Sequence, residues 1–290
     1  MFLTAFIFLS CYPPVSLVDV VKTPAKSVER ISKAASAGGP ISEQEEYYIG
    51  RAVASNIVAK YPILENSELT QYLNLIGTTI ALNSDRPRTL SGYHFAVLDT
   101  EDINAYACPG GIIFVTRGVI ESVNNEDELA AVLAHEVAHI SNKDGTSSIE
   151  STRGSGLFAA LIKEPFKIAG NLGPGQLALL TNMFVKAVDD VFDTVVINGY
   201  SPEQELKADR DAVSYLTRSG YDPEALLIYE TKLYNDPNFS MERKMNTHPG
   251  LEERIRNIKA TIPPSQPNQQ YFEIRKERFE RVVQPEVVSN

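Results

Sequence analysis

The sequence is poor in several residues that common kinds of site require. It has two cysteines in 290 residues, Cys11 and Cys108, and this number excludes a disulfide-stapled scaffold. Basic residues are also outnumbered, because 27 Lys and Arg face 37 Asp and Glu. The net charge of -10 argues against nucleic-acid binding, since an acidic surface repels phosphates. Any site built on imidazole must draw on four histidines, which are His94, His135, His139 and His248.

Long apolar runs are missing too, apart from a short one at the amino terminus. Residues 1–10 are too few to span a bilayer as a helix, and they resemble the apolar core of a secretory signal. Cys11 follows at once, so residues 8–11 resemble a bacterial lipoprotein box in which Cys11 would carry a lipid anchor. A plain cleaved signal is the alternative. We therefore expect residues 1–11 to be a signal or lipoprotein-type segment and the protein to be exported to the bacterial periplasm or cell envelope.

The rest of the chain has the composition of an ordinary globular protein, with 43% apolar and 22% charged residues. Residues 12–40 are rich in Pro, Ser, Ala and Gly and are expected to be a linker. A domain over 41–262 and a polar tail over 263–290 complete the predicted organisation. Capping signals and apolar periodicity predict an α+β, mostly helical fold with one small sheet. Strands are expected at 93–99 and 105–117, the second interrupted by Pro-Gly-Gly, and helices at 42–60, from 67, and at 125–141, 156–169, 176–195, 202–218, 223–235 and 250–260. The polar tail is expected to hold one last short element around residues 271–283.

The sharpest signal is an HExxH motif, His135-Glu136-Val137-Ala138-His139, inside a predicted helix. Residues four apart lie on one face of a helix, so both imidazoles can hold one zinc ion. Glu136 is then placed to act on a zinc-bound water as general base. The metzincin extension of this motif is absent, because Asn142 and Gly145 stand where a glycine and a third histidine are needed.

A third ligand must come from another segment, and the acid-rich helix 202–218 is the candidate. Glu205 and Asp209 are four residues apart and share a face. One of them can bind zinc while the other accepts the spare N–H of a zinc-bound histidine, although a solvated helix face is the alternative for both. Glu203 and Asp211 fall on other faces and are expected to be solvated.

Four stretches in order resemble metallopeptidase family forty-eight, the gluzincins that include HtpX-type heat-shock proteases, CAAX prenyl proteases and BepA-like periplasmic proteases. Residues 128–139 are similar to the zinc helix of the family, and residues 205–209 (Glu-Leu-Lys-Ala-Asp) to its second zinc motif. Residues 104–118 resemble its Asn-Ala…Pro-Gly-Gly strand, and residues 247–254 its Thr-His-Pro segment. The resemblance spans about residues 40–260 and departs from many relatives at Lys143-Asp144, where they carry Arg-His; we do not expect this pair to bind zinc.

The resemblance implies a zincin-like (gluzincin) metallopeptidase domain over 41–262, with the sheet beside the HExxH helix. It implies one zinc ion per chain, held by His135, His139 and Glu205, and Asp209 as the partner of His135. It also implies that a strand pairs with the substrate backbone, as an added β-strand would. The residues of this strand are Gly111, Ile112, Ile113, Phe114 and Val115.

Two further residues have open roles. His248 lies in a Thr-His-Pro loop, where it is expected either to close the zinc site at rest, to donate to the developing oxyanion, or to bond locally. Arg254 is expected either to pair with an acidic residue of the site or to support packing.

The predicted function is that of a zinc-dependent endopeptidase acting on polypeptides, such as misfolded or envelope proteins. The alternative is a zinc-binding, chaperone-like or interaction module without proteolysis. Glu136 favours the enzyme, because zinc binding alone does not need this carboxylate.

Overall fold

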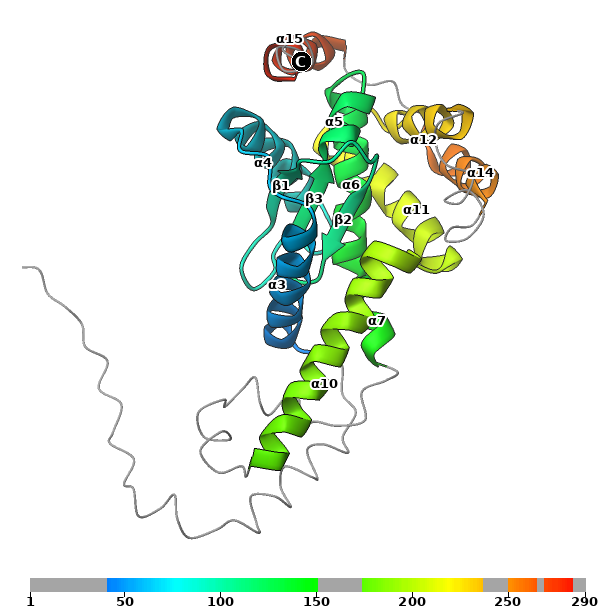
Figure 1. The fold of residues 1–290 in the computed structure, drawn as a ribbon. Coiled ribbons are helices and arrows are strands. Elements are labelled where there is room, and N and C mark those ends of the chain that lie inside the picture. Colours follow the sequence, from blue (N-terminus) through cyan, green and yellow to red (C-terminus); the bar gives the residue numbers. More distant parts are fainter. Residues whose placement is uncertain (1–40, 151–173, 237–249, 265–268, 284–290) are drawn as a thin grey trace, which may run out of the picture.

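The computed structural model describes residues 41–150, 174–236, 250–264 and 269–283. It is mostly helical with one small sheet, which confirms the predicted fold class (Figure 1). The strands are β1 (His94–Leu98), β2 (Ala105–Cys108) and β3 (Ile112–Thr116). The helices are α3 (Glu43–Lys60), α4 (Ser67–Leu82), α5 (Arg117–Ser122), α6 (Glu126–Asn142), α7 (Asp144–Glu150), α10 (Pro174–Phe192), the π-helix η1 (Asp193–Asn198), α11 (Pro202–Ser219), α12 (Ala225–Asn235), α14 (Leu251–Thr261) and α15 (Gln269–Val282).

The sheet has the order β1-β3-β2, with β3 parallel to β1 and antiparallel to β2. The turn between β2 and β3 is the Pro-Gly-Gly sequence. Gly110 and Gly111 have φ angles of 82° and 109°, which an L side chain would strain. The turn makes β2 and β3 neighbours, and the pairing of β3 with β1 on its other side makes β3 the central strand and leaves β2 at one edge of the sheet.

Helix α6 runs through the middle of the molecule and packs against α4, α11, α12 and β2 (Figure 1). It begins where the Asn125 side chain accepts the Glu128 N–H at 2.9 Å, as the sequence predicts. Its apolar side chains are fully buried, including Leu129, Leu133 and Val137. Burial on nearly every side fixes the rotation of α6, and with it the direction of the HExxH side chains.

Helix α3 approaches the Pro-Gly-Gly turn at very close range. A Cβ atom on Gly50 would lie 1.7 Å from the Pro109 carbonyl oxygen, so only glycine fits there. The Gly110 N–H donates to Glu46 Oε1 at 3.1 Å, and Glu46 forms a two-pronged pair with Arg86 at 2.7 and 2.8 Å. These contacts hold the end of the sheet nearest to this turn against α3.

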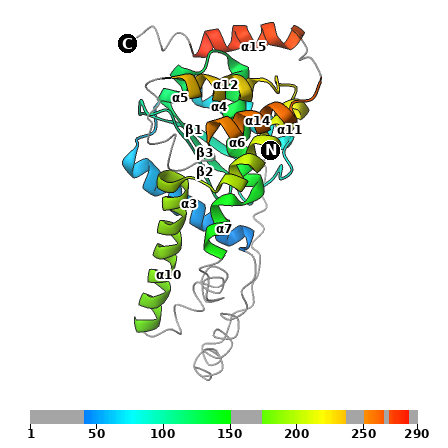
Figure 2. The same ribbon diagram turned by 90° about the vertical axis from the view of Figure 1, so that its right-hand side faces the viewer.

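The long helix α10 and the C-terminal α15 lie at opposite ends of the molecule (Figure 2). Helix α10 is anchored to α3 by buried side chains in its second half, among them Val188 and Val191. Helix α15 packs against the start of α6 and buries Phe279. No helix of the described residues has the length and apolar character that crossing a membrane requires.

Two short helices, α5 and α7, were not predicted, because each has fewer than eight residues and little periodicity. The predicted helix at 156–169, the segment around Cys11 and the linker lie outside the described residues.

Candidate metal centre

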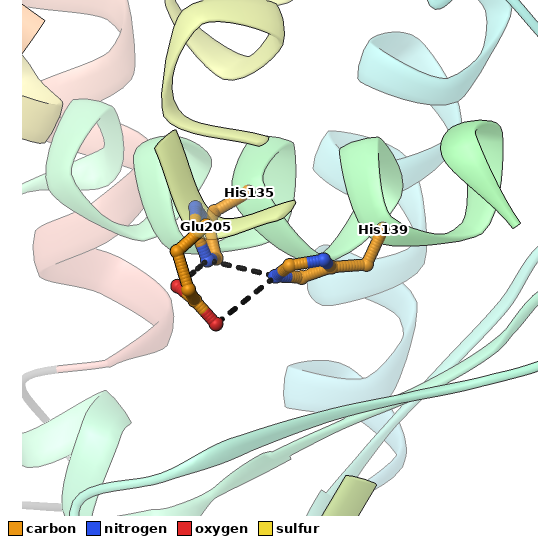
Figure 3. A group of neighbouring side chains, drawn as sticks. All are labelled: His135, His139 and Glu205. Carbon is orange, nitrogen blue, oxygen red and sulfur yellow. Dashed lines mark hydrogen bonds and ion pairs between the residues drawn. The ribbon is translucent and has the colours of Figure 1, made fainter. Parts of the chain in front are cut away.

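The two histidines of the HExxH motif and Glu205 converge on one point between α6 and α11 (Figure 3). The Nε2 atoms of His135 and His139 are 3.0 Å apart. Glu205 reaches them from α11, with Oε2 at 3.3 Å from His135 Nε2 and Oε1 at 3.8 Å from His139 Nε2. Helical spacing alone placed the two imidazoles together, but the packing of α11 on α6 brings the carboxylate.

This cluster has the donor set of a catalytic metal site. Two imidazole nitrogens and one carboxylate are the protein ligands of several catalytic zinc sites, which leave one position open. All three candidate ligand atoms lie within 4.8 Å of one another. Burial lowers the pKa of His135, but bonding to Asp209 and Glu205 outweighs this effect and raises the pKa to about 10. The surroundings therefore favour a cation at this point, and the three residues fit a metal ion.

Asp209 and Arg254 lie behind His135. The Nδ1 atom of His135 is 3.2 Å from Asp209 Oδ1, and Arg254 holds both oxygens of Asp209 at 2.6 and 2.9 Å. Burial alone would raise the pKa of Asp209, but Arg254 and then His135 lower it. Arg254 also contacts Glu230 at 3.0 Å and Glu205 at 3.5 Å. Of the two roles expected for Arg254, the structure therefore shows pairing with buried acidic residues.

Glu136 follows His135 on α6 and is almost completely buried. Burial raises the pKa of this carboxyl, and the imidazoles of His139 and His135 partly oppose the rise. A raised pKa suits a group that must take up a proton and release it again.

Comparison with known proteins identifies the family. The model of Peptidase family M48 matches residues 67–262. This chain belongs to Peptidase family M48. The three residues that could hold a metal ion lie within the matched region and on the motifs that the sequence resemblance indicated.

Individual M48 relatives are distant in sequence. The chain is 26% identical to the beta-barrel assembly-enhancing protease of Escherichia coli (strain K12) over 227 residues, which is 76% of this chain and 44% of that protein. It is 24% identical to the metalloprotease LoiP of Escherichia coli (strain K12) over 194 residues, or 67% of this chain and 71% of LoiP. The chain thus spans less than half the length of the beta-barrel assembly-enhancing protease.

Three further residues, which the sequence did not indicate as part of the site, lie around the candidate ligands. Asp144 lies 2.8 Å from His139 Nδ1, and the ring of Tyr200 stacks on the His139 ring with centroids 4.0 Å apart. Glu230 joins the ion pairs of Arg254. An acid just beyond the HExxH helix was the available signal for Asp144, whereas nothing local marked Tyr200 or Glu230.

The strand expected to pair with substrate is not at an edge. Residues Ile112–Thr116 form β3, which is bonded to β1 on one side and to β2 on the other. The prediction that residues 111–115 pair with a substrate backbone is therefore wrong, because an added strand would have to displace a neighbour. The mistake arose because the sequence does not give the strand order.

The outer edge of the sheet on this side belongs to β2. The Thr116 N–H donates to the Asn104 carbonyl at 3.0 Å, so the backbone groups of Asn104 point towards β3. Because this direction alternates along an antiparallel strand, the backbone groups of Tyr106 also point towards β3. Ala105 and Ala107 then direct their backbone groups away from β3. His248 lies outside the described residues, and its role stays a prediction.

Proposed function

We propose that this M48 chain is a zinc-dependent endopeptidase, with one zinc ion held by His135, His139 and Glu205. The convergence of these three donors, two of them buried and His135 half-buried, carries the proposal. When bound, zinc supplies a Lewis acid that polarises a peptide carbonyl and lowers the pKa of a water molecule.

Glu136 is the general base of this proposal. It takes the proton of the attacking water and passes it to the leaving amine. It directly follows His135 on α6, the imidazoles of His139 and His135 act on its carboxyl group, and its raised pKa suits the return of the proton.

The outer edge of β2 is the proposed place for the substrate. An extended polypeptide can add to an edge strand through its backbone, so side-chain requirements are loose. The Ala107 carbonyl on this edge accepts the Tyr200 hydroxyl at 3.3 Å, and a substrate N–H would compete for it. Loose recognition suits misfolded or envelope proteins, and the similarity to a beta-barrel assembly-enhancing protease supports this class. The proposed location is the bacterial periplasm or envelope, with a lipid anchor at Cys11.

His248 has two proposed roles with opposite consequences. If it closes the metal site at rest, His248→Ala keeps zinc and raises basal proteolysis. If it donates to the oxyanion, the same change lowers turnover by roughly 10²–10³-fold. An unchanged rate would reject both roles and leave local bonding within the loop.

One experiment separates the endopeptidase from a zinc-binding module without proteolysis. Zinc content and casein cleavage are measured for the wild type, for Glu136→Gln and for Glu203→Gln, an exposed acid on α11. We expect Glu136→Gln to keep zinc and lose nearly all cleavage, and Glu203→Gln to match the wild type. Cleavage by Glu136→Gln within roughly tenfold of wild type would show that another group is the base.

A further inference from the structure

Each imidazole of the metal centre has a carboxylate behind it, but only one of the two pairs was expected from the sequence. Asp209 faces Nδ1 of His135, as predicted. On the other side, Asp144 Oδ2 lies 2.8 Å from Nδ1 of His139, and both side chains are buried. We propose that Asp144 is a positioning residue that orients His139 for metal binding. This inference rests on the proposed zinc site.

The end of α6 is shaped so that Asp144 can turn back to His139. The helix ends at Asn142, and Lys143 adopts the left-handed conformation with φ 60° and ψ 31°. Among the described residues, Lys143 is the sole non-glycine with positive φ. This reversal lets α7 begin immediately at Asp144, so the first side chain of α7 points at the last turn of α6.

Asp144 is itself held by α11, the helix that supplies Glu205. The Gln204 side-chain amide lies 3.3 Å from Asp144 Oδ1 and donates to Ser147 Oγ at 2.9 Å. The carbonyl oxygen of the same side chain accepts the Ser201 N–H at 2.9 Å and caps α11. Gln204 thus fixes Asp144 and the start of α11 together, one residue before Glu205.

The consequence for His139 is a single ring orientation and a single tautomer. An Nδ1–H that donates to Asp144 leaves the Nε2 lone pair facing His135 and Glu205. Stacking on Tyr200, with rings inclined by 27°, sets the plane of the imidazole but not which nitrogen carries the proton. Asp144 therefore determines which nitrogen of His139 carries the proton, which stacking cannot do.

The test measures zinc affinity by competition with a chelator of known affinity, and kcat and KM for casein at saturating zinc. The variants are Asp144→Ala and Asp144→Asn, with Asp211→Ala and Asp211→Asn as matched controls. Asp211 accepts from Asn142 at 2.9 Å and from Lys207 at 2.7 Å, so it also links α6 to α11 but touches no imidazole. We expect Asp144→Ala to weaken zinc binding by roughly 10–100-fold, as the loss of a carboxylate behind a ligand does.

Asp144→Asn should weaken zinc binding less than Asp144→Ala, because its amide oxygen still accepts from Nδ1. At saturating zinc, kcat should fall in Asp144→Ala with KM unchanged, which a purely structural role would not produce. A zinc affinity of Asp144→Ala equal to that of Asp211→Ala would overturn the inference. If the alanine variant does not fold, equal affinities of the two asparagine variants overturn it instead. A wild type that binds no zinc would defeat the proposed function itself, which is a different result.

Discussion

At the scale of single residues, this M48 site is held by acids that are buried with their partners. His135 and His139 each face a carboxylate through Nδ1, and Asp209 is in turn held by Arg254. Such partners fix imidazole orientation and raise ligand basicity. The three candidate metal ligands are therefore the inner part of a larger network of buried charged groups.

Glu205 and Asp209 share a face of α11 but should differ in what their loss does. Glu205→Ala removes one of three ligands and should abolish stoichiometric zinc binding. Asp209→Ala removes the partner of His135 and should weaken affinity by roughly 10–100-fold. Metal analysis after dialysis, with chelator competition, distinguishes the two. Retention of zinc by Glu205→Ala together with its loss from Asp209→Ala would mean that the roles are reversed.

Arg254 should matter for stability, because it neutralises several acids at once. It lies within 3.5 Å of Asp209, Glu205 and Glu230, and all four side chains are buried. Arg254→Met leaves these carboxylates uncompensated and should lower the free energy of unfolding by about 3–5 kcal/mol, measured by urea denaturation. Arg210→Met, on the exposed face of α11, is the control and should change it by less than about 0.5 kcal/mol. Equal effects of the two changes would contradict this account.

Zinc affinity should fall as pH is lowered. In the metal-free site, bonding to Asp209 and Glu205 holds the pKa of His135 at about 10, so this imidazole is protonated at neutral pH. Zinc binds the neutral ring and must displace the proton, so each unit of pH decrease should raise the apparent Kd about tenfold for one proton released. Chelator competition at pH 6, 7 and 8 checks this. An apparent Kd independent of pH would contradict the protonation of His135.

At the scale of elements, capping residues determine where helices begin, and close backbone contacts between distant segments determine how the helices pack. Ser42 and Ser201 form capping boxes with Glu45 and Gln204. The Pro-Gly-Gly turn, by contrast, matters through its contact with α3, which lies far away in the sequence.

Gly50 provides the test of that contact. Replacing glycine by alanine in a helix ordinarily stabilises it by about 1 kcal/mol. Here the new methyl group would meet the Pro109 carbonyl, so Gly50→Ala should instead destabilise the protein by about 1–3 kcal/mol. Ala52→Gly, in the same helix, should cost about 1 kcal/mol from helix propensity alone. A higher Tm for Gly50→Ala would show that α3 and the turn are not in close contact.

At the scale of the whole molecule, the helix that closes the described chain lies beyond the family match at residue 262. Helix α15 buries Arg275, which lies 3.1 Å from Asp127 at the start of α6 and donates to the Gly220 carbonyl at 2.8 Å. Asp127 is two turns before His135, about 12 Å along the helix axis. Helix α15 therefore supports α6 from the end opposite to the candidate metal ligands.

Arg275→Met should lower stability without changing the chemistry. It leaves the buried Asp127 carboxylate without its cation and should cost about 3 kcal/mol in the free energy of unfolding. Lys276→Met removes only an exposed pair with Glu280 at 4.0 Å and should cost less than about 0.5 kcal/mol. Zinc content and cleavage at low temperature should match the wild type in both. Loss of zinc from folded Arg275→Met would show that α15 shapes the metal centre.

The sequence by itself determined what depends on neighbours along the chain. Helix starts follow from caps, and the pairing of His135 with His139 follows from helical spacing, because both are local geometry. Glu205 was placed at the metal by resemblance to a family motif, since spacing left it equivalent to Asp209. The structure brings Glu205 beside the Nε2 atom of His135 and Asp209 behind the same ring.

Only the tertiary structure decided which segments meet. The order β1-β3-β2 puts the outer edge on β2 rather than on residues 111–115, because strand order depends on contacts between distant segments. Packing of α14 against α11 likewise brought Arg254 to Asp209. Asp144 reaches His139 because the backbone of Lys143 is left-handed. A lysine in the sequence does not predict this conformation, so the surrounding packing must enforce it.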